Sequence, residues 1–350
     1  MGLGNLSNSQ SQISNWVLKH NLCVVCGACV GICPYFNYID GKVMLMDFCT
    51  QETGKCHQIC PKLVIPDVSS SEAFEMQSSM GTYKDIVMAR AADEHIRQHA
   101  QYGGFTTAML IYALQKAWIE GAVLTNKGDE NSSTGIFAKT PNDILACSGS
   151  RFNGSASLSV FNRCLRDNQK KIAIVGLPCQ LIAVSQMENL SDEGEAIKNS
   201  IALKLGLFCT WALDFRRLRE YLKKQGIHQR ILKYDIPPPP EESFKVLTES
   251  GWIQFPLQEI RQLIQYGCTS CLDMTAEASD ISVGMAENQA GWNTVMIRTQ
   301  RGFDLFSQAV QEGVIETCSI PEANRIHLQE ASLSKKKRGF NQFQTIRSEL

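Results

Sequence analysis

Residues 23–34 read CVVCGACVGICP, a run in which four cysteines follow the spacing C-x2-C-x2-C-x3-C-P. Thiolates at this spacing bind a cubane 4Fe-4S cluster, because three cysteines two residues apart surround one face of it. Gly27 and Ala28 keep the intervening backbone small enough to approach the inorganic sulfides. The run predicts an electron-transfer module in the first part of the chain.

A second, irregular set of cysteines follows and ends in the same C-x3-C-P step. Thr50 and Thr53 stand where a regular second run would carry cysteines. In two-cluster proteins the fourth cysteine of each run binds the neighbouring cluster. We therefore expect a first cluster on Cys23, Cys26, Cys29 and Cys60, and a second on Cys33, Cys49 and Cys56.

The second cluster lacks one ligand on this count. Cys268 and Cys271 form a further C-x2-C pair, which is our candidate source of that ligand. The alternative is a one-cluster protein whose second site has collapsed. Zinc and disulfides fit less well, because zinc sites usually present two separated C-x2-C pairs and residues 1–12 hold no apolar secretory segment.

Composition limits the class of protein. The 350 residues are 44% hydrophobic, which leaves room for a large core after a small module. Lys and Arg number 34 against 35 Asp and Glu, so no net charge attracts nucleic acid, and no apolar run approaches the about 18 residues of a membrane span. We expect a soluble, cytoplasmic protein whose 14 cysteines are ligands or reduced thiols. Cys147, Cys164 and Cys318 are expected to be isolated buried thiols.

The fold class predicted is a bacterial-ferredoxin-like α+β module, residues 1–75, followed by a larger α/β domain, residues 76–350. The Ser-rich stretch 68–71 marks the connector between them. Four prolines at residues 237–240 predict a stiff connection that divides the α/β domain into two lobes. The basic residues 335–338 are interpreted as a solvated or subunit-docking tail.

Hydrophobic periodicity places the elements of the larger domain. Strands are predicted at residues 86–89, 122–125, 171–176, 201–208, 280–285 and 294–298. Helices are predicted at residues 104–120, closed by Gly121, and at 179–188, 214–224, 257–265 and 303–311. Their alternation is typical of an α/β fold.

Two segments have the composition of a phosphate cradle. Gly103, Gly104, Thr106 and Thr107 open a helix, whose free N–H groups and positive dipole end favour an anion. The turn at residues 149–154 adds a cation; its candidate residues are Ser150 and Arg151. Plain helix capping and an ordinary surface loop are the alternative interpretations.

A third segment, residues 176–180, is a strand-to-helix elbow. It carries Pro178, Cys179 and Gln180 at the carboxyl end of a buried strand, where α/β sheets bind ligands. Cys179 could act as a nucleophile, but no dedicated base accompanies it in the sequence. We favour backbone donors at the helix start that face a cofactor.

Taken in order, these motifs resemble the coenzyme F420 hydrogenase/dehydrogenase beta-subunit family. The resemblance also rests on Leu205 to Cys209, on Cys268 and Cys271 followed by Asp273, on the ASDISVG stretch at residues 278–284, and on Gly291-Trp292. It covers most of the chain. The irregular second cysteine run departs from a regular pattern.

The resemblance implies a flavin, FAD or alternatively FMN, held on the α/β domain beside 4Fe-4S clusters. It also implies hydride exchange with coenzyme F420 and a partner subunit of hydrogenase, formate dehydrogenase or heterodisulfide reductase type that donates or accepts electrons. The implied pocket residues are Gly103, Gly104, Thr106, Thr107, Ser150, Arg151, Pro178, Cys179, Gln180, Asp280 and Gly284. Two alternatives remain: a related reductase with another acceptor, and a subunit that only conducts electrons.

Overall fold

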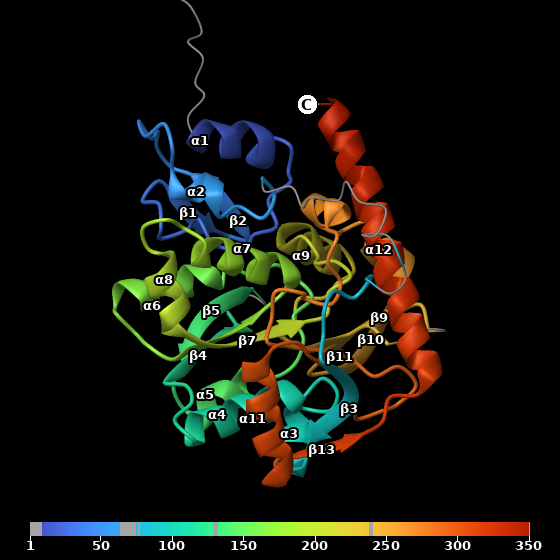
Figure 1. Cartoon of the computed structure of the whole chain (residues 1–350). Helices are drawn as coiled ribbons and strands as arrows, with labels where there is room; N and C mark the ends of the chain where they lie inside the picture. Colours follow the sequence, from blue (N-terminus) through green and yellow to red (C-terminus); the bar gives the residue numbers. More distant parts are fainter. Residues whose placement is uncertain (1–8, 64–74, 76–77, 129–131, 238–240, 350) are drawn as a thin grey trace, which may run out of the picture.

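The computed structural model describes residues 9–63, 75, 78–128, 132–237 and 241–349. The Ser-rich connector at residues 68–71 lies outside these ranges. The fold is a mixed α/β structure built on one large sheet (Figure 1).

The N-terminal region is a small layer of short elements. A helical turn, α1 Ser9–Gln12, continues into the π-helical segment Ile13–Leu18, and a short helix, α2 Lys55–Gln58, closes the region. Between them β1 Phe36–Ile39 pairs antiparallel with β2 Lys42–Leu45. Asp40 and Gly41 both have positive φ, as expected for a tight Asp-Gly hairpin turn.

Eight strands form the central sheet in the order β13-β3-β12-β11-β7-β6-β4-β5. β4, β6, β7 and β11 run parallel to one another, so their carboxyl ends share one edge. β12 and β5 are antiparallel to their neighbours. The bounds are β3 Asp85–Ala91, β4 Gly121–Lys127, β5 Ser133–Ala138, β6 Ile172–Gly176, β7 Ile201–Leu207, β11 Ile281–Met285, β12 Asn293–Ile297 and β13 Ile315–Cys318.

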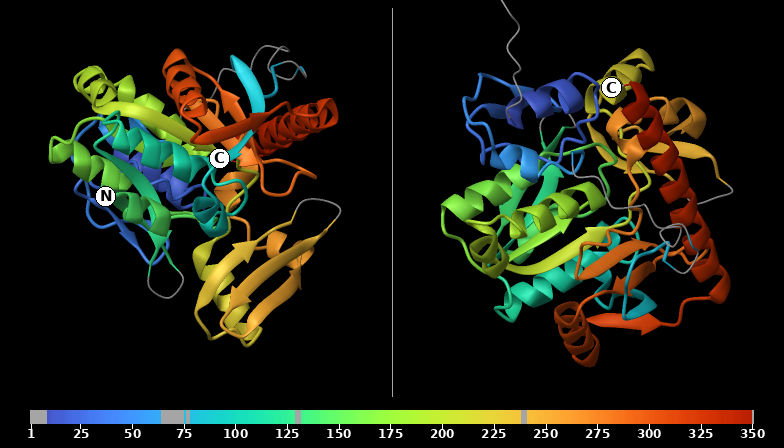
Figure 2. Two further views of the ribbon diagram at one scale, coloured as in Figure 1. Left: turned by 90° about the horizontal axis from the view of Figure 1, so that it is seen from below. Right: turned by 45° about the horizontal axis from the view of Figure 1, so that its top comes forward.

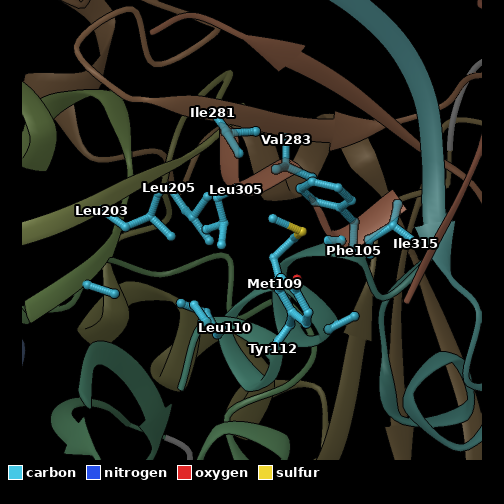
Figure 3. Close-up of a cluster of buried hydrophobic side chains, with 14 of the residues drawn as sticks. Phe105, Met109, Leu110, Tyr112, Leu203, Leu205, Ile281, Val283, Leu305 and Ile315 are labelled. Atoms are coloured by element: carbon cyan, nitrogen blue, oxygen red, sulfur yellow. The ribbon is translucent and has the colours of Figure 1, made fainter. Parts of the chain in front are cut away.

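Successive residues of a strand point to opposite faces, so the sheet has two cores. Ala173 packs on one side, while Ile172 and Ile174 pack on the other. The first side is covered by α4 Phe105–Gln115, α5 Pro141–Ala146 and α11 Gln300–Gln311, and Figure 3 shows Phe105 and Met109 of α4 facing the strands. The second is covered by α6 Leu158–Arg166, α7 Pro178–Glu188 and α8 Gly194–Ser200. The N-terminal region lies over this second side (Figure 1).

A second, three-stranded sheet is inserted between β7 and β11 and stands beside the main body (Figure 2, left). It consists of β8 Ile231–Asp235, β9 Ser243–Thr248 and β10 Gly251–Pro256, with α9 Phe215–Lys224 and α10 Leu257–Arg261 packed near it. β8 and β9 pair with each other. The prediction that residues 237–240 separate two lobes is therefore wrong, because both flanking strands belong to one sheet.

Most predicted strands and helices are confirmed within a few residues, with three differences. The helix predicted at residues 104–120 stops at Gln115, and Gly121 begins β4 instead of closing the helix. A Cβ at Gly121 would lie 2.6 Å from the Phe137 ring, so the approach of β5 explains the glycine. The helix at 257–265 stops at Arg261, and a 3-10 turn follows at Tyr266–Ser270.

The third difference concerns the C-terminal region. Residues 335–338 are part of a 28-residue helix, α12 Glu322–Glu349, which runs along one side of the molecule (Figure 1). Lys335 is only 4% exposed. The prediction of a solvated tail is wrong at this residue. A further helix, α3, spans Glu94–His99.

Candidate iron–sulfur and flavin site

None of the fourteen cysteines, all of which lie in the described ranges, forms a disulfide bond. Within the described part of the chain, no set of three or more His, Cys, Asp or Glu side chains has the arrangement that holds a metal ion. We group the cysteines below by their burial and by which thiols lie close enough to raise one another's pKa.

The inner group consists of Cys23, Cys26, Cys29 and Cys60. These thiols line a pocket together with Gly27 and Ala28, and Cys56 of the outer group described below reaches the same pocket. Burial raises the pKa of Cys23 to about 12 and raises that of Cys26 still further, with Cys60 adding to both shifts. The structure thus brings together the four thiols that the sequence predicted for a first cluster.

The inner group is fixed to the beginning of α6. Gly27 has φ +84, and a Cβ there would lie 2.5 Å from the carbonyl oxygen of Ala156. The Leu158 N–H donates to the carbonyl of Cys26 at 3.2 Å. Asn162 donates from Nδ2 to the carbonyls of Ala28 and Val30, at 2.8 and 2.7 Å. The cysteine run is therefore docked tightly on the α/β domain.

The outer group consists of Cys33, Cys49 and Cys56. Burial raises the pKa of Cys56 to about 11, and Cys33 and Cys49 contribute to the shift. The loop after Cys49 is held by α1, because Gln10 Oε1 accepts from the Cys49 N–H at 2.8 Å and Ser9 Oγ accepts from the Gly54 N–H at 2.7 Å. These are the three thiols that the sequence assigned to a second cluster.

A third group, which the sequence reasoning missed, consists of Cys179, Cys209, Cys268 and Cys271. Burial and the other three thiols, together with Cys26, raise the pKa of Cys179. The pKa of Cys209 is raised to about 12, chiefly by burial, with Cys268 and Cys271 contributing to the rise and Lys335 opposing it. We call this the sheet-edge group.

The tertiary fold explains the sheet-edge group. Cys179 follows β6 and Cys209 follows β7, so the carboxyl ends of two neighbouring parallel strands present one thiol each. Cys268 and Cys271 come from the 3-10 turn and the residue after it. Cys268 and Cys271 therefore lie with Cys179 and Cys209, and not with the outer group as predicted. The sequence contains one signal that could have revealed this group: a cysteine, Cys179 or Cys209, follows each of two successive predicted strands.

The three groups follow one another in space. Cys29 interacts electrostatically with Cys56 of the outer group, and Cys26 interacts with Cys179 of the sheet-edge group. Lys62 lies between the inner and sheet-edge groups, donating from Nζ to the carbonyl of Gly267 at 2.9 Å and to Ser270 Oγ at 2.7 Å. The inner group is thus the middle member of the series.

The glycines at the start of α4 lie at the same sheet edge. Gly104 has φ +74, and a Cβ on Gly103 would lie 2.7 Å from Asn293 Oδ1. Asn293 accepts at Oδ1 from the Phe105 N–H at 3.3 Å and donates from Nδ2 to the Gly284 carbonyl at 3.1 Å. The predicted residues Gly103, Gly104 and Gly284 are therefore brought together by Asn293, which the sequence analysis did not single out.

The predicted turn at residues 149–154 packs against this helix start. The hydroxyls of Thr107 and Ser148 share a hydrogen bond of 3.1 Å, and the Ser150 N–H donates to Gln101 Oε1 at 3.4 Å. Thr106, on the same helix turn, is half-buried. Residues from the two predicted cradle segments form one surface.

Arg151 is the main cation of this surface. Its Nη2 donates to the carbonyl of Ser148 at 3.2 Å, while its buried Nε has no hydrogen-bond partner among the described residues. Burial lowers its pKa. Lys127, at the end of β4, also has its pKa lowered, first by burial and then by Arg151. Among the residues that the structure describes, neither cation forms an ion pair with a carboxylate, so the pair fits a bound anion.

Unpartnered polar atoms continue along the same segment. Within the described ranges, Asn153 Nδ2 and Ser155 Oγ are buried without a hydrogen-bond partner. Together with Arg151 Nε, they give three unsatisfied atoms within residues 151–155. Buried polar groups are normally satisfied, so these atoms have donor and acceptor capacity left for a bound molecule.

Three predicted pocket residues have structural roles. Pro178 is the first residue of α7, and Gln180 closes its start by accepting at Oε1 from the Leu177 N–H at 2.8 Å. Asp280 precedes β11, at the end away from the cradle, and accepts from Lys204, Thr299 and Arg301. The prediction that Asp280 lines the flavin pocket is not supported by this placement.

The three isolated cysteines differ in burial. Cys164 is buried, and Cys147 is partly buried with its pKa raised by burial to about 11. Cys318 is exposed, so the prediction of a buried thiol is wrong there.

Among the helices of the described residues, none has the length and apolar character to cross a membrane.

The carboxyl edge of the parallel strands gathers four cysteines and two cations, which is an arrangement expected of an α/β redox protein. Residues 86–162 match the N-terminal part of the family described as coenzyme F420 hydrogenase/dehydrogenase, beta subunit, and residues 169–323 match the C-terminal part of the same family. The chain belongs to this family and is an oxidoreductase. The cysteine runs at residues 23–60 precede both matches.

Individual relatives agree with this assignment. The chain is 32% identical over 247 residues to the coenzyme F420 hydrogenase subunit beta of Methanothermobacter thermautotrophicus, which covers 69% of this chain and 87% of the relative. It is 28% identical over 316 residues to the coenzyme F420-dependent sulfite reductase of Methanocaldococcus jannaschii, covering 86% of this chain and 48% of the relative. A chain of the F420-reducing NiFe hydrogenase complex from Methanosarcina barkeri is similar in structure, with a TM-score of 0.69, 29% identity, and coverage of 75% of this chain and 91% of that chain.

Proposed function

We propose that this protein is an iron–sulfur flavoprotein subunit that passes electrons between iron–sulfur clusters and a flavin and exchanges hydride with coenzyme F420. It acts as the beta subunit of a hydrogenase, formate dehydrogenase or similar complex. The observation that carries the proposal is the series of cysteine groups, outer to inner to sheet-edge, which leads to the cradle at the carboxyl edge of the sheet.

The thiols have the surroundings that cluster ligands need. Burial raises the pKa of Cys23, Cys26 and Cys179, so these groups become thiolates only when positive charge is close. Iron supplies that charge, and each thiolate of a cluster binds a different iron atom. Lys62 and Lys335 add fixed cations beside the inner and sheet-edge groups.

The cradle fits a flavin that carries phosphate. Arg151 and Lys127 would neutralise the phosphates, and the N-terminus of α4 would add its dipole and N–H donors. Asn153 Nδ2 and Ser155 Oγ would bind polar atoms of the same molecule. When bound, the flavin supplies the exchange between single electrons and hydride, and the chain's residues orient it toward coenzyme F420. FAD, with two phosphates, uses both cations.

The partner would be a catalytic subunit that donates or accepts single electrons. Met46 and Phe48 are 58% and 81% exposed, and both lie just before Cys49 of the outer group. We infer that Met46 and Phe48 belong to the surface that contacts the partner subunit, because contiguous exposed apolar side chains are typical of such surfaces. Because cysteine ligands must stay reduced before cluster insertion, we assign the complex to the cytoplasm.

The test is anaerobic reconstitution of the full chain, followed by flavin extraction and a dye-coupled assay of coenzyme F420 reduction. The expected result is bound flavin, low-potential clusters and turnover of coenzyme F420. Absence of flavin would overturn the proposal in favour of an electron-conducting subunit, and flavin without turnover would favour another acceptor. The Cys26→Ser variant should lose iron and retain flavin. Unchanged iron would contradict the assignment of the inner group.

A further inference from the structure

The outer group has one thiol fewer than the other two groups. The chain contains 14 cysteines, of which four form the inner group, four the sheet-edge group and three the outer group. The remaining three have other neighbours: Cys147 interacts with Arg151 and Asp143, Cys164 lies in the core under α6, and Cys318 is exposed on β13. No cysteine of this chain is left to complete the outer group.

The missing position is known from the spacing. Counting back from Cys60 and Cys56 in a regular C-x2-C-x2-C-x3-C run places cysteines at residues 53 and 50, where the chain has threonines. Cys49 stands next to position 50, which leaves residue 53 as the position without a nearby cysteine. The side chains at residues 50–53 are mostly exposed. Thiolate is the ligand of iron–sulfur clusters, and a threonine hydroxyl is a poor replacement.

The loop that contains Thr53 is held in place by two buried residues of α1. Ser9 and Gln10 are 8% and 3% exposed. Besides the bonds to Cys49 and Gly54, the Ser9 N–H donates to the Glu52 carbonyl at 3.1 Å and Gln10 Nε2 donates to the Asp47 carbonyl at 2.8 Å. The backbone of residues 47–54 is therefore held against α1, while the side chains of residues 51–53 are exposed to solvent.

We propose that the outer group binds a three-iron 3Fe-4S cluster through Cys33, Cys49 and Cys56, with its fourth corner open toward solvent beside Thr53. An iron atom at that corner has no thiolate to retain it, whereas every iron of the inner and sheet-edge clusters has one. The inference rests on the proposed function, because it specifies the cluster at the solvent end of the same electron path.

The experiment uses the full chain, reconstituted anaerobically with iron and sulfide and then oxidised. Oxidised three-iron clusters are paramagnetic and oxidised four-iron cubanes are not, so the electron paramagnetic resonance spectrum should show one three-iron signal per chain. Cys56→Ala should abolish this signal, and Cys179→Ala should leave it. A signal that disappears in Cys179→Ala and persists in Cys56→Ala would overturn the proposal, because it would come from a damaged cubane elsewhere.

A gain-of-ligand variant tests the same point without loss of a native cysteine. Thr53→Cys should remove the three-iron signal and add one iron per chain, whereas the matched control Gln51→Cys should leave both unchanged. An oxidised wild type that has no three-iron signal, yet loses four irons in Cys56→Ala, would refute the three-iron assignment and leave the electron path intact. If neither Cys26→Ser nor Cys56→Ala lowers the iron content, the proposed function fails as well.

Discussion

Lys335 Nζ lies 2.5 Å from the carbonyl oxygen of Cys209, to which it donates a hydrogen bond. It also donates to the carbonyl of Asp273 at 2.8 Å. Burial alone would lower the pKa of Lys335, but Cys271, Cys209 and Asp273 outweigh it and hold that pKa above its ordinary value. A buried ammonium group from α12 thus stands beside the sheet-edge thiols.

Replacement of this charge should make the sheet-edge cluster harder to reduce. In Lys335→Met the added electron loses a nearby cation, so the reduction potential should fall by on the order of 60 mV, a tenfold change for a one-electron couple. A redox titration followed by electron paramagnetic resonance measures it. Lys336→Met is the control, because Lys336 pairs with Glu277 instead. An equal shift in both variants would exclude a specific role for Lys335.

The Cys179→Ala variant tests whether Cys179 is a cluster ligand or a residue of the flavin pocket. Cys179→Ala should lower iron content by one cluster while flavin remains bound, since its neighbours are Cys26, Cys209, Cys268 and Cys271. Iron analysis and flavin extraction on the same sample provide the measurement. Loss of flavin with full iron content would restore the original pocket assignment.

Arg151 is predicted to hold the flavin phosphate. Arg151→Gln should weaken flavin binding roughly ten- to hundredfold, because a hydrogen bond to a charged group contributes about 1.5–3 kcal/mol. Fluorescence titration of the flavin-free protein measures this, and Arg163→Gln, an exposed position on α6, serves as the control. Unchanged affinity in Arg151→Gln would remove the residue from the site.

Gly27 should be needed for docking of the inner cysteine run. Gly27→Ala introduces a Cβ against Ala156, in addition to the roughly 1–2 kcal/mol that left-handed backbone costs a non-glycine residue. Gly226→Ala is a matched control, since Gly226 has φ +78 and nothing within 4 Å of the added atom. Chemical denaturation should show a larger loss of stability for Gly27→Ala. Equal losses would mean that the contact with Ala156 relaxes freely.

The β1–β2 hairpin should detach more readily in acid. The Arg219 hydrogen bond, with Arg216 nearby, holds the pKa of Asp40 below its ordinary value of 3.8. The stabilisation is fully present above the unfolded-state pKa and is lost as the pH falls through the folded-state one. Because Asp40 is 40% exposed, the effect stays under about 1 kcal/mol. Unfolding of wild type and Asp40→Asn, compared at neutral pH and at about pH 3, should show a larger difference in stability at neutral pH than in acid.

Much of the fold was readable from local pattern. β6 and the start of α7 follow from a short apolar run and from Pro178, and α9 begins where Asp214 caps it by accepting from the Arg217 N–H. The extent of α12 was not predicted, because its polar sequence has no clear apolar stripe. Burial of Lys335 depends on carbonyls from two distant loops, which no local pattern encodes.

The sequence by itself determined the ligand chemistry, since the spacing of Cys23, Cys26, Cys29 and Cys33 is a local property of the chain. Only the tertiary structure decided which distant cysteines belong together. Parallel strands β6 and β7 bring Cys179 beside Cys209, although the two residues are far apart in the sequence. Strand order and the loops that pack on the sheet edge determine which cysteines come together. Neither can be read from the spacing of a single motif.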